Sequence, residues 1–391
     1  MFLVALVSML ALPAVAGDDS LRERLERKAD RRSGRAEVAQ DRWVSACELV
    51  DDADPRTSRL ADRAQKSLVG ARYRHVCVAR VLDAWDRPEG EIRVFYATNR
   101  ARAEGGVTAY RSGDSDRIEY GVAMVRVPPG RAVGAIDRVD IRAIEPLSEE
   151  SFLASVRDAL DAAGPYAQLV TYVHGYNNSF DYAARRTAQI ADDVGTPVVP
   201  VMYAWPSNGG TWFAGAKYTW DENEAARSSS MLSDVLGGML SGTAGAPMTL
   251  VAHSMGSRLE IDGRPLREIV LAAPDLDAAV FERRYLDVSL QAASRLTVYC
   301  ATDDRALKFS RSVHGGYDRL GSCHPETMQA LGRERLEIVD ASNLYADIVD
   351  HDKVADSPQL LADLGAVLRG VPAADPGRGL VAEGDHWELP P

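Results

Sequence analysis

The sequence predicts an α/β fold in which helices cover both faces of a mostly parallel β-sheet. From residue 149 onward, short apolar segments typical of buried strands alternate with longer amphipathic segments typical of helices. Such alternation indicates parallel strands, because each crossover between them needs a connection long enough for a helix. One apolar segment, residues 248–253, follows the turn residues Gly245-Ala246-Pro247 and leads into Ser254-Met-Gly256. In sheets of this kind the chemistry lies at the carboxyl ends of the strands.

Composition and charge limit the classes of partner. The chain has 391 residues, of which 46% are hydrophobic and 26% charged, which is typical of a globular protein with one large domain and a smaller addition. The formal net charge of −12 argues against general nucleic-acid binding and against an anionic membrane surface as the main partner. Cysteines and histidines do not cluster with the spacing of zinc ligands, so we expect no metal site.

The first 17 residues resemble a secretory signal peptide. Residues 2–16 are apolar but too few to span a bilayer, and they end in Ala14-Val15-Ala16, the small-x-small pattern of a cleavage site. No Lys or Arg precedes the apolar run. We expect cleavage and a periplasmic or secreted protein, with an uncleaved N-terminal anchor as the alternative. No later segment is apolar enough over a sufficient length to span a membrane.

Four cysteines follow this segment, namely Cys47, Cys77, Cys300 and Cys323. An even number behind a signal peptide fits disulfides formed in an oxidising compartment. The economical pairing is Cys47–Cys77 and Cys300–Cys323, because each pair is local in sequence. Four cysteines allow three pairings, so the pattern alone leaves the choice open.

Two regions flank the predicted α/β domain of residues 91–370. Residues 18–90 are predicted to form a small helical region, in which the Arg-rich run 21–36 is better explained as a solvated helix face than as an anion-binding site, because acids are interspersed. Residues 371–391 are rich in Pro and Gly, and we expect a poorly ordered tail there.

Within the domain, strands come first and the alternation follows. The expected strands are residues 92–98, 120–127, 139–144, 168–173, 197–204, 248–253, 268–272, 296–301 and 336–340. The expected helices are residues 149–163, 180–193, 221–240, 278–294 and 358–368. Residues 100–116 are polar and contain glycine, so we expect a loop.

Ser254 is the candidate nucleophile. Residues 252–256 fit the pattern G-x-S-x-G, with Ala252 in the first glycine position. In that pattern a serine sits on a tight strand-to-helix turn, and small neighbours let the backbone fold back, so the hydroxyl and the following N–H both face the substrate. Taken alone, the pattern fits an ordinary strand ending in a small-residue turn equally well.

A serine nucleophile needs a base, and the base needs an acid that orients it. The order expected on such a sheet is serine, then acid, then histidine. Asp304, after the strand at 296–301, is the first candidate acid, and Asp303 is the second. Adjacent carboxylates at a strand end are also typical helix caps. Asp275 and Asp277, after the preceding strand, give another possible location.

His351 is the candidate base, because it follows the last predicted strand, residues 336–340, and precedes the last predicted helix. The other histidines are placed less favourably: His75 in the N-terminal region, His174 and His253 at two strand ends, His314 and His324 after Asp304, and His386 in the tail.

The strand at 168–173 ends in His174-Gly175-Tyr176-Asn177-Asn178. A glycine here lets the backbone approach a substrate, so we assign the N–H groups of Tyr176 and Met255 as oxyanion donors. Each such donor is worth about 3 kcal/mol of transition-state stabilisation. The same residues also fit a strand-to-helix turn with Asn178 or Ser179 as the helix N-cap, and the two interpretations are compatible.

A group of aromatic residues follows the strand at 197–204. Such residues line substrate pockets in some enzymes, but aromatic residues more often belong to the core. Residues 209–215 between them are glycine-rich and fit a mobile loop over the site. The group comprises Tyr203, Trp205, Trp212, Phe213, Tyr218 and Trp220.

Taken together, these motifs resemble the DUF900 family of bacterial α/β-hydrolases over residues 91–370. The resemblance implies the α/β-hydrolase fold, with Ser254 as nucleophile, Asp304 as acid and His351 as base, and it requires no cofactor. The matching segments are Val94-Phe-Tyr-Ala-Thr-Asn-Arg100, Tyr120-Gly-Val-Ala123, Val173-His-Gly-Tyr-Asn-Asn-Ser-Phe180, Ala204-Trp-Pro-Ser207, Tyr218 with Asp221, Ala252-His-Ser-Met-Gly256, Ala273-Pro-Asp-Leu-Asp277 and Asp304-Arg-Ala-Leu307.

The chain differs from the family pattern in three places. The helix after Ser254 is expected to be short, because residues 261–265 are rich in turn formers. The sequence around His351 lacks a His-Ser-Tyr pattern, and the N-terminal region lies outside the resemblance. The expectation is an exported serine hydrolase that acts on small-molecule or lipid esters, or less favourably on amides. A non-catalytic envelope binding or scaffolding protein on the same fold is the alternative.

Overall fold

The computed structural model of the protein describes residues 90–103, 109–207, 215–258, 265–331, 334–344, 351 and 353–390. The predicted signal peptide, the helical region before residue 90 and the Cys47–Cys77 pair therefore lie outside the described residues. The same holds for most of the predicted loop at 209–215, with Trp212 and Phe213.

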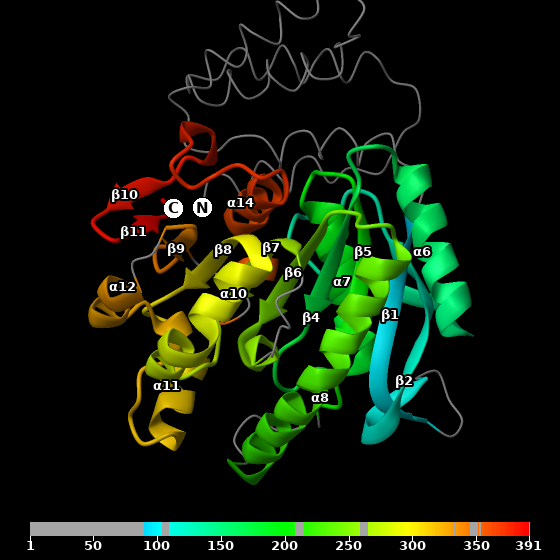
Figure 1. Cartoon of the computed structure of the whole chain (residues 1–391), viewed down its shortest axis with the longest axis horizontal. Helices are drawn as coiled ribbons and strands as arrows, with labels where there is room; N and C mark the ends of the chain where they lie inside the picture. Colours follow the sequence, from blue (N-terminus) through cyan, green and yellow to red (C-terminus); the bar gives the residue numbers. More distant parts are fainter. Residues whose placement is uncertain are drawn as a thin grey trace, which may run out of the picture.

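A single twisted sheet forms the centre of the molecule (Figure 1). Its strand order is β10-β11-β9-β8-β7-β6-β4-β5-β1-β2-β3 in the described part of the chain. All neighbours from β1 to β11 pair in parallel, whereas β2 and β3 join antiparallel at one edge and β10 at the other. The predicted mostly parallel sheet is thus confirmed. The strands are β1 Gly90–Arg102, β2 Tyr110–Val127, β3 Asp140–Leu147, β4 Gln168–Val173, β5 Val198–Ala204, β6 Met248–His253, β7 Leu266–Ala272, β8 Ala293–Cys300, β9 Leu336–Asp340, β10 Val381–Glu383 and β11 His386–Glu388.

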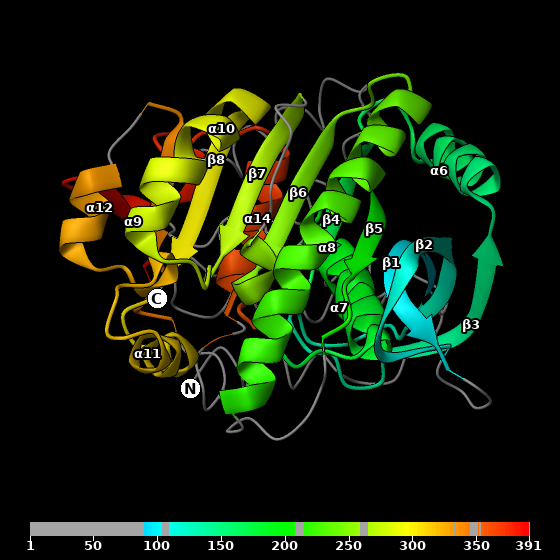
Figure 2. The same ribbon diagram turned by 60° about the horizontal axis from the view of Figure 1, so that its bottom comes forward.

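Helices cover both faces of the sheet (Figure 2). Side chains of α6, α8 and α10 pack in one core cluster with Leu169, Leu250 and Ile269, whereas α7 and α14 pack against the opposite face, which includes Val170 and Val251. Neighbouring strand residues thus point to opposite faces, both of them buried, which explains the unbroken apolar runs in the sequence. The helices are α6 Glu149–Ala163, α7 Phe180–Asp193, α8 Gly215–Gly242, α9 Ala278–Val280, α10 Leu286–Ala292, α11 Arg305–Val313, α12 Pro325–Leu331, α13 Lys353–Asp356 and α14 Pro358–Leu368, with short η segments at Ser254–Ser257, Phe281–Tyr285, Leu320–Ser322 and Pro376–Arg378.

Side-chain caps explain why several helices begin where the sequence predicts. The Ser148, Ser179 and Ser357 hydroxyls accept hydrogen bonds from the backbone N–H groups of Ser151, Tyr182 and Leu360, at the starts of α6, α7 and α14. Each cap satisfies a donor that has no partner within its own helix. The cap at Ser179 matters most for the site, because it ends the loop that follows β4.

The prediction of a loop over residues 100–116 is wrong for most of its length. β1 continues to Arg102 and β2 begins at Tyr110, and the two strands pair with register shifts between Thr98 and Arg102. Arg102 forms an ion pair with Glu119 across this ribbon. Apart from Arg100 and Tyr110, which are buried, the described residues of this ribbon between 100 and 116 are exposed or half-buried and mostly polar, so the apolar alternation that signals a strand is absent.

The tail also differs from its prediction. The sequence predicts a poorly ordered tail over residues 371–391, but within residues 371–390 β10 and β11 extend the sheet, and β11 pairs in parallel with β9. Arg378 is buried and forms ion pairs with Asp363 of α14 and Glu337 of β9. These partners are distant in sequence, so the local Pro and Gly content gave no indication of them.

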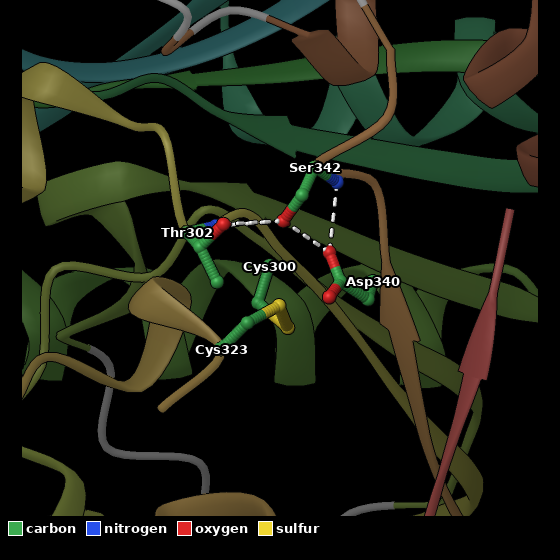
Figure 3. Close-up of a disulfide and its surroundings, with 5 residues drawn as sticks. All are labelled: Cys300, Thr302, Cys323, Asp340 and Ser342. Carbon is green, nitrogen blue, oxygen red and sulfur yellow. Dashed lines mark hydrogen bonds between the residues drawn. A yellow bond between two sulfur atoms is a disulfide. The ribbon is translucent and has the colours of Figure 1, made fainter. Parts of the chain in front are cut away.

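A disulfide joins Cys300, at the end of β8, to Cys323, after the η segment at Leu320–Ser322 (Figure 3). This half of the predicted pairing is confirmed. The enclosed segment carries Asp304 and α11, so the bond restrains the loop that holds the candidate acid. Close by, the Thr302 N–H donates to the Ser342 hydroxyl, and Ser342 donates to Asp340, which ties the ends of β8 and β9 together.

Replacing both Cys300 and Cys323 by serine is expected to lower the free energy of unfolding by about 3 kcal/mol, because the bond closes a loop of 23 residues. Urea unfolding with and without a reductant measures the effect. The double variant serves as the control, since any effect of the reductant on it belongs to other cysteines. A wild type with free thiols at both positions would contradict the assignment.

Candidate active site

Ser254 lies on the turn between β6 and the one-turn segment Ser254–Ser257. Its φ angle is +53°, in the left-handed region that residues other than glycine rarely adopt. Backbone strain of this kind clusters at functional sites, where the surrounding structure has to stabilise it. The short segment after Ser254, predicted from the turn formers that follow it, is confirmed as a single 3₁₀ turn.

Two glycines allow this turn to pack against the loop after β4. A Cβ atom added to Gly256 would lie 2.4 Å from the His174 carbonyl oxygen, and one added to Gly175 would lie 2.8 Å from the Cβ of Ser254. Neither position therefore tolerates a side chain without movement of the backbone or of the candidate nucleophile. Ala252, in the first glycine position of the motif, is fully buried in the core, where its methyl group is accommodated.

Ser254, His351 and Asp304 come together at the carboxyl ends of the strands. The Nε2 atom of His351 lies 2.7 Å from the Ser254 hydroxyl, and its Nδ1 atom lies 2.7 Å from Oδ2 of Asp304. The carboxylate can only accept at this distance, so Nδ1 carries the proton and Nε2 is free to accept one from Ser254. This is the arrangement of a nucleophile, a base and an orienting acid.

Asp304 also caps α11, since its Oδ1 accepts a hydrogen bond of 2.9 Å from the Leu307 N–H. One oxygen of this carboxylate therefore caps the helix, as the sequence allows, and the other contacts His351. The cap fixes the side chain so that Oδ2 faces His351. Only 1% of the Asp304 side chain is exposed, so its charge acts with little screening by solvent.

The other candidate acids lie in other surroundings. Asp303 is half-buried on the turn before Asp304. The hydrogen bond from Nδ1 of His351 goes to Asp304 and not to Asp303. Asp277 caps α9 by accepting from the Val280 N–H. Asp275 forms a buried ion pair with Arg319.

Asp275 belongs to a buried polar group under the nucleophile turn that the sequence did not reveal. Its backbone N–H donates to the Ser254 carbonyl oxygen at 3.1 Å, and its carboxylate accepts from Ser310 and Tyr218. Burial raises the pKa of Asp275, but Arg319, Arg258 and these donors outweigh it, so the pKa is below its ordinary value. The charged carboxylate thus holds together the loops that surround Ser254. Asp275 and Tyr218 belong to segments that match the family pattern, whereas nothing in the sequence around Arg319 indicated a buried ion pair.

The remaining histidines of the described residues have other contacts. His253 packs its ring 4.9 Å from that of His351, and its Nε2 donates to the His351 carbonyl oxygen at 3.3 Å, which helps to hold the base. His314 contacts Glu222, and His324 lies near Asp318. His386 is part of β11.

The two predicted oxyanion donors lie on different loops, Tyr176 after β4 and Met255 after β6. The Gly175 carbonyl oxygen accepts from Nδ1 of His174 at 2.9 Å and from Nδ2 of Asn178 at 3.1 Å. In a trans peptide the N–H points opposite to the carbonyl, so the Tyr176 N–H is directed away from both donors. Met255 is at the start of a helical turn, where backbone N–H groups lack intrahelical acceptors. Within the described residues, neither N–H donates to another protein group.

The aromatic group divides between core and site. Tyr203 and Trp205 are buried in the main core cluster, so the core interpretation is correct for these two. The Trp205 indole donates to the His174 carbonyl oxygen at 2.7 Å and stacks on the His174 ring. Tyr218 packs against Tyr176, with ring centroids 5.4 Å apart, next to the candidate oxyanion loop.

Space around the described part of the site is limited. A void of about 20 Å³ lies behind His351 and Asp304, which is enough for a water molecule but not for a substrate. A cavity of about 570 Å³ lies near the amino ends of β7, β8 and β9, away from the candidate site, and its lining includes Arg267, Arg295 and Trp387. Among the described residues, no group of His, Cys, Asp and Glu side chains has an arrangement that could hold a metal ion.

Comparisons with known proteins give one match. The family model described as alpha/beta hydrolase of unknown function (DUF900) matches residues 148–368, which is more than half of the chain and includes Ser254, Asp304 and His351. No curated protein matches, and no solved structure does either. With this extent of match, on a mostly parallel sheet covered by helices on both faces, the chain belongs to the DUF900 family of α/β-hydrolases.

Proposed function

We propose that the protein is a serine hydrolase that cleaves carboxylic esters through an acyl-enzyme. The observation that carries this proposal is the position of the His351 ring, which lies 2.7 Å from both the Ser254 hydroxyl and the Asp304 carboxylate. Membership in an α/β-hydrolase family supports hydrolytic chemistry in general. A small-molecule or lipid ester is the proposed substrate, and amides are a less favoured one.

In the proposed reaction, the Ser254 oxygen attacks the ester carbonyl while Nε2 of His351 takes the hydroxyl proton. Asp304 stabilises the resulting imidazolium, and the Tyr176 and Met255 N–H groups bind the oxyanion. Collapse of the tetrahedral intermediate breaks the ester bond, and His351 returns its proton to the leaving alcohol. A water molecule then attacks the acyl-enzyme with the same base, which releases the acid and regenerates Ser254. These steps need no metal or organic cofactor.

The low exposure of the serine favours a second candidate function. Only 3% of Ser254 is exposed, and a substrate carbonyl has to reach its hydroxyl. A non-catalytic binding or scaffolding protein on the same fold would keep the serine covered in this way. Labelling with an active-site probe distinguishes the two functions.

A fluorophosphonate probe is expected to label the wild type, because it reacts with serines that an adjacent base activates. Ser254→Ala should abolish the labelling. Ser257→Ala is the matched control, since Ser257 lies on the same turn but donates to the Ala252 carbonyl oxygen. An unlabelled wild type, or equal labelling of Ser254→Ala, would support the non-catalytic function.

Loss of the base or of the acid is expected to lower kcat for p-nitrophenyl acetate by about 10³- to 10⁴-fold. His351→Ala removes the base. Asp304→Asn removes the charge but keeps an oxygen that can cap α11, so the thermal midpoint should change little. Asp303→Asn is the matched control for the neighbouring carboxylate and should retain activity. Retention of more than a tenth of the activity by His351→Ala would assign the base to another group.

We also propose that the protein is exported to the periplasm or secreted. The apolar residues 2–16 with their small-residue end and the Cys300–Cys323 disulfide support this location. No helix within the described ranges has the length and apolarity needed to cross a bilayer.

Mass spectrometry of the fractionated protein, expressed from its full chain in a bacterium, tests the export. The expected result is a periplasmic or extracellular chain that begins at Gly17, after cleavage behind Ala16. A full-length chain in the membrane fraction would instead support the uncleaved anchor. A cytoplasmic chain with free thiols would contradict export.

A further inference from the structure

We propose that Arg100 and His174 are positioning residues that orient the Gly175–Tyr176 peptide for oxyanion binding. This inference rests on the proposed function, because it concerns the donor loop of the same site. Neither side chain belongs to the Ser254–His351–Asp304 group. Both belong to a buried polar chain that runs from β1 to the loop after β4.

Arg100 is a buried cation that bonds neutral acceptors. Arg100 is 1% exposed. Its Nη2 atom donates to the Asn178 carbonyl oxygen at 2.6 Å and to Nε2 of His174 at 3.3 Å. Its Nη1 atom donates to the Ser207 carbonyl oxygen at 3.3 Å. No carboxylate of the described residues forms an ion pair with it. Burial lowers the pKa of Arg100 to about 10, although the charges of Asp221 and Asp181 act in the opposite direction, so the side chain remains charged at neutral pH.

Burying a cation without an ion-pair partner is costly, so its acceptors have to be well placed. A nonpolar residue of similar volume would avoid this cost. Two of the three acceptors, the Asn178 carbonyl and the His174 ring, belong to the loop that presents the Tyr176 N–H. We therefore assign to the Arg100 charge the role of fixing the loop after β4.

Arg100 sets the tautomer of His174. A guanidinium only donates, so the Nε2 atom of His174 has to be an acceptor and the ring proton has to be on Nδ1. Burial, and then the charge of Arg100, lower the pKa of His174 to about 3, so the ring is neutral throughout the range in which the enzyme would work. The Nδ1 proton is donated to the Gly175 carbonyl oxygen at 2.9 Å.

The tautomer in turn sets the direction of the peptide. With its carbonyl held by His174 and by Asn178, the Gly175–Tyr176 peptide directs its N–H to the opposite side. Gly175 lies against Ser254, since an added Cβ would come within 2.8 Å of the serine Cβ. Hydrogen bonds to the carbonyl also polarise the peptide, which makes its N–H a stronger donor. Arg100 thus acts on the oxyanion through His174 and one peptide group.

Because the oxyanion exists only in the transition state and the intermediate, loss of this support should lower kcat and leave KM nearly unchanged. Removing a whole oxyanion donor costs about 10²- to 10³-fold in kcat, so misdirecting one should cost about 10- to 100-fold. A purely structural role would lower the thermal midpoint without this selective loss of kcat.

The test compares Arg100→Met, His174→Phe and His174→Asn, assayed with p-nitrophenyl acetate well below their thermal midpoints. Arg100→Met and His174→Phe should lose kcat by about 10- to 100-fold, whereas His174→Asn should recover part of it, because the Asn amide can occupy the position of Nδ1. Arg378→Met is the matched control, since it removes a buried arginine at the other edge of the sheet and should lower stability without lowering kcat. Wild-type kcat in folded Arg100→Met or His174→Phe would overturn the proposal.

A second readout does not depend on activity. In ¹⁵N NMR of the wild type, His174 should show a protonated Nδ1 and an unprotonated Nε2 that do not titrate between pH 5 and 8. The opposite tautomer, or titration in this range, would overturn the proposal even if Arg100→Met fails to fold. If the wild type neither hydrolyses esters nor reacts with the fluorophosphonate, the proposed function fails, whereas the tautomer still decides whether Arg100 holds the loop.

Discussion

The close approach of two strand ends is the constraint on which the site depends. β4 and β6 are neighbours in the sheet, and the loops that follow them touch where Gly175 meets Ser254 and Gly256 meets the His174 carbonyl. At both glycines the neighbouring atoms lie too close for a Cβ atom to fit. The approach brings a candidate nucleophile and a candidate oxyanion donor from two separate strands to one point, and the left-handed backbone of Ser254 is a consequence of the tight turn this requires.

The acid and the base reach this point from the neighbouring strands β8 and β9. Asp304 is held from several sides: Oδ1 caps α11, Oδ2 faces His351, and the Cys300–Cys323 disulfide closes the segment that carries it. His351 is held through its carbonyl oxygen by His253, the residue before the nucleophile. Geometry within a few tenths of an ångström depends on such supporting contacts, since a catalytic group that is free to rotate loses most of its advantage.

Much of this arrangement could be predicted from the sequence, and the exceptions share a physical cause. Strands such as Gln168–Val173 and Met248–His253 are buried on both faces, so their apolar runs stand out, and the turn motifs at Gly175 and Ser254 encode local backbone geometry. The far parts of β1 and β2, within residues 99–119, and the strands β10 and β11 were missed because their stability comes from long-range partners. Glu119 pairs with Arg102, and Arg378 pairs with Asp363 and Glu337. No local pattern encodes a partner that is distant in sequence.

Arg100 is the clearest case of this limit. It was visible only as the last residue of a family-like segment, and nothing in its sequence neighbours indicates a buried cation. Arg378 and Arg319 are also buried, but each faces a carboxylate, so their charges stabilise the fold directly. Arg100 instead faces carbonyl oxygens and a neutral imidazole. If only stability mattered, we would expect either a carboxylate in direct contact with Arg100 or an apolar residue in its place. Asp221 and Asp181 lie near enough to act on this charge, but neither forms an ion pair with it. We therefore explain the buried charge by what it orients, the single Gly175–Tyr176 peptide.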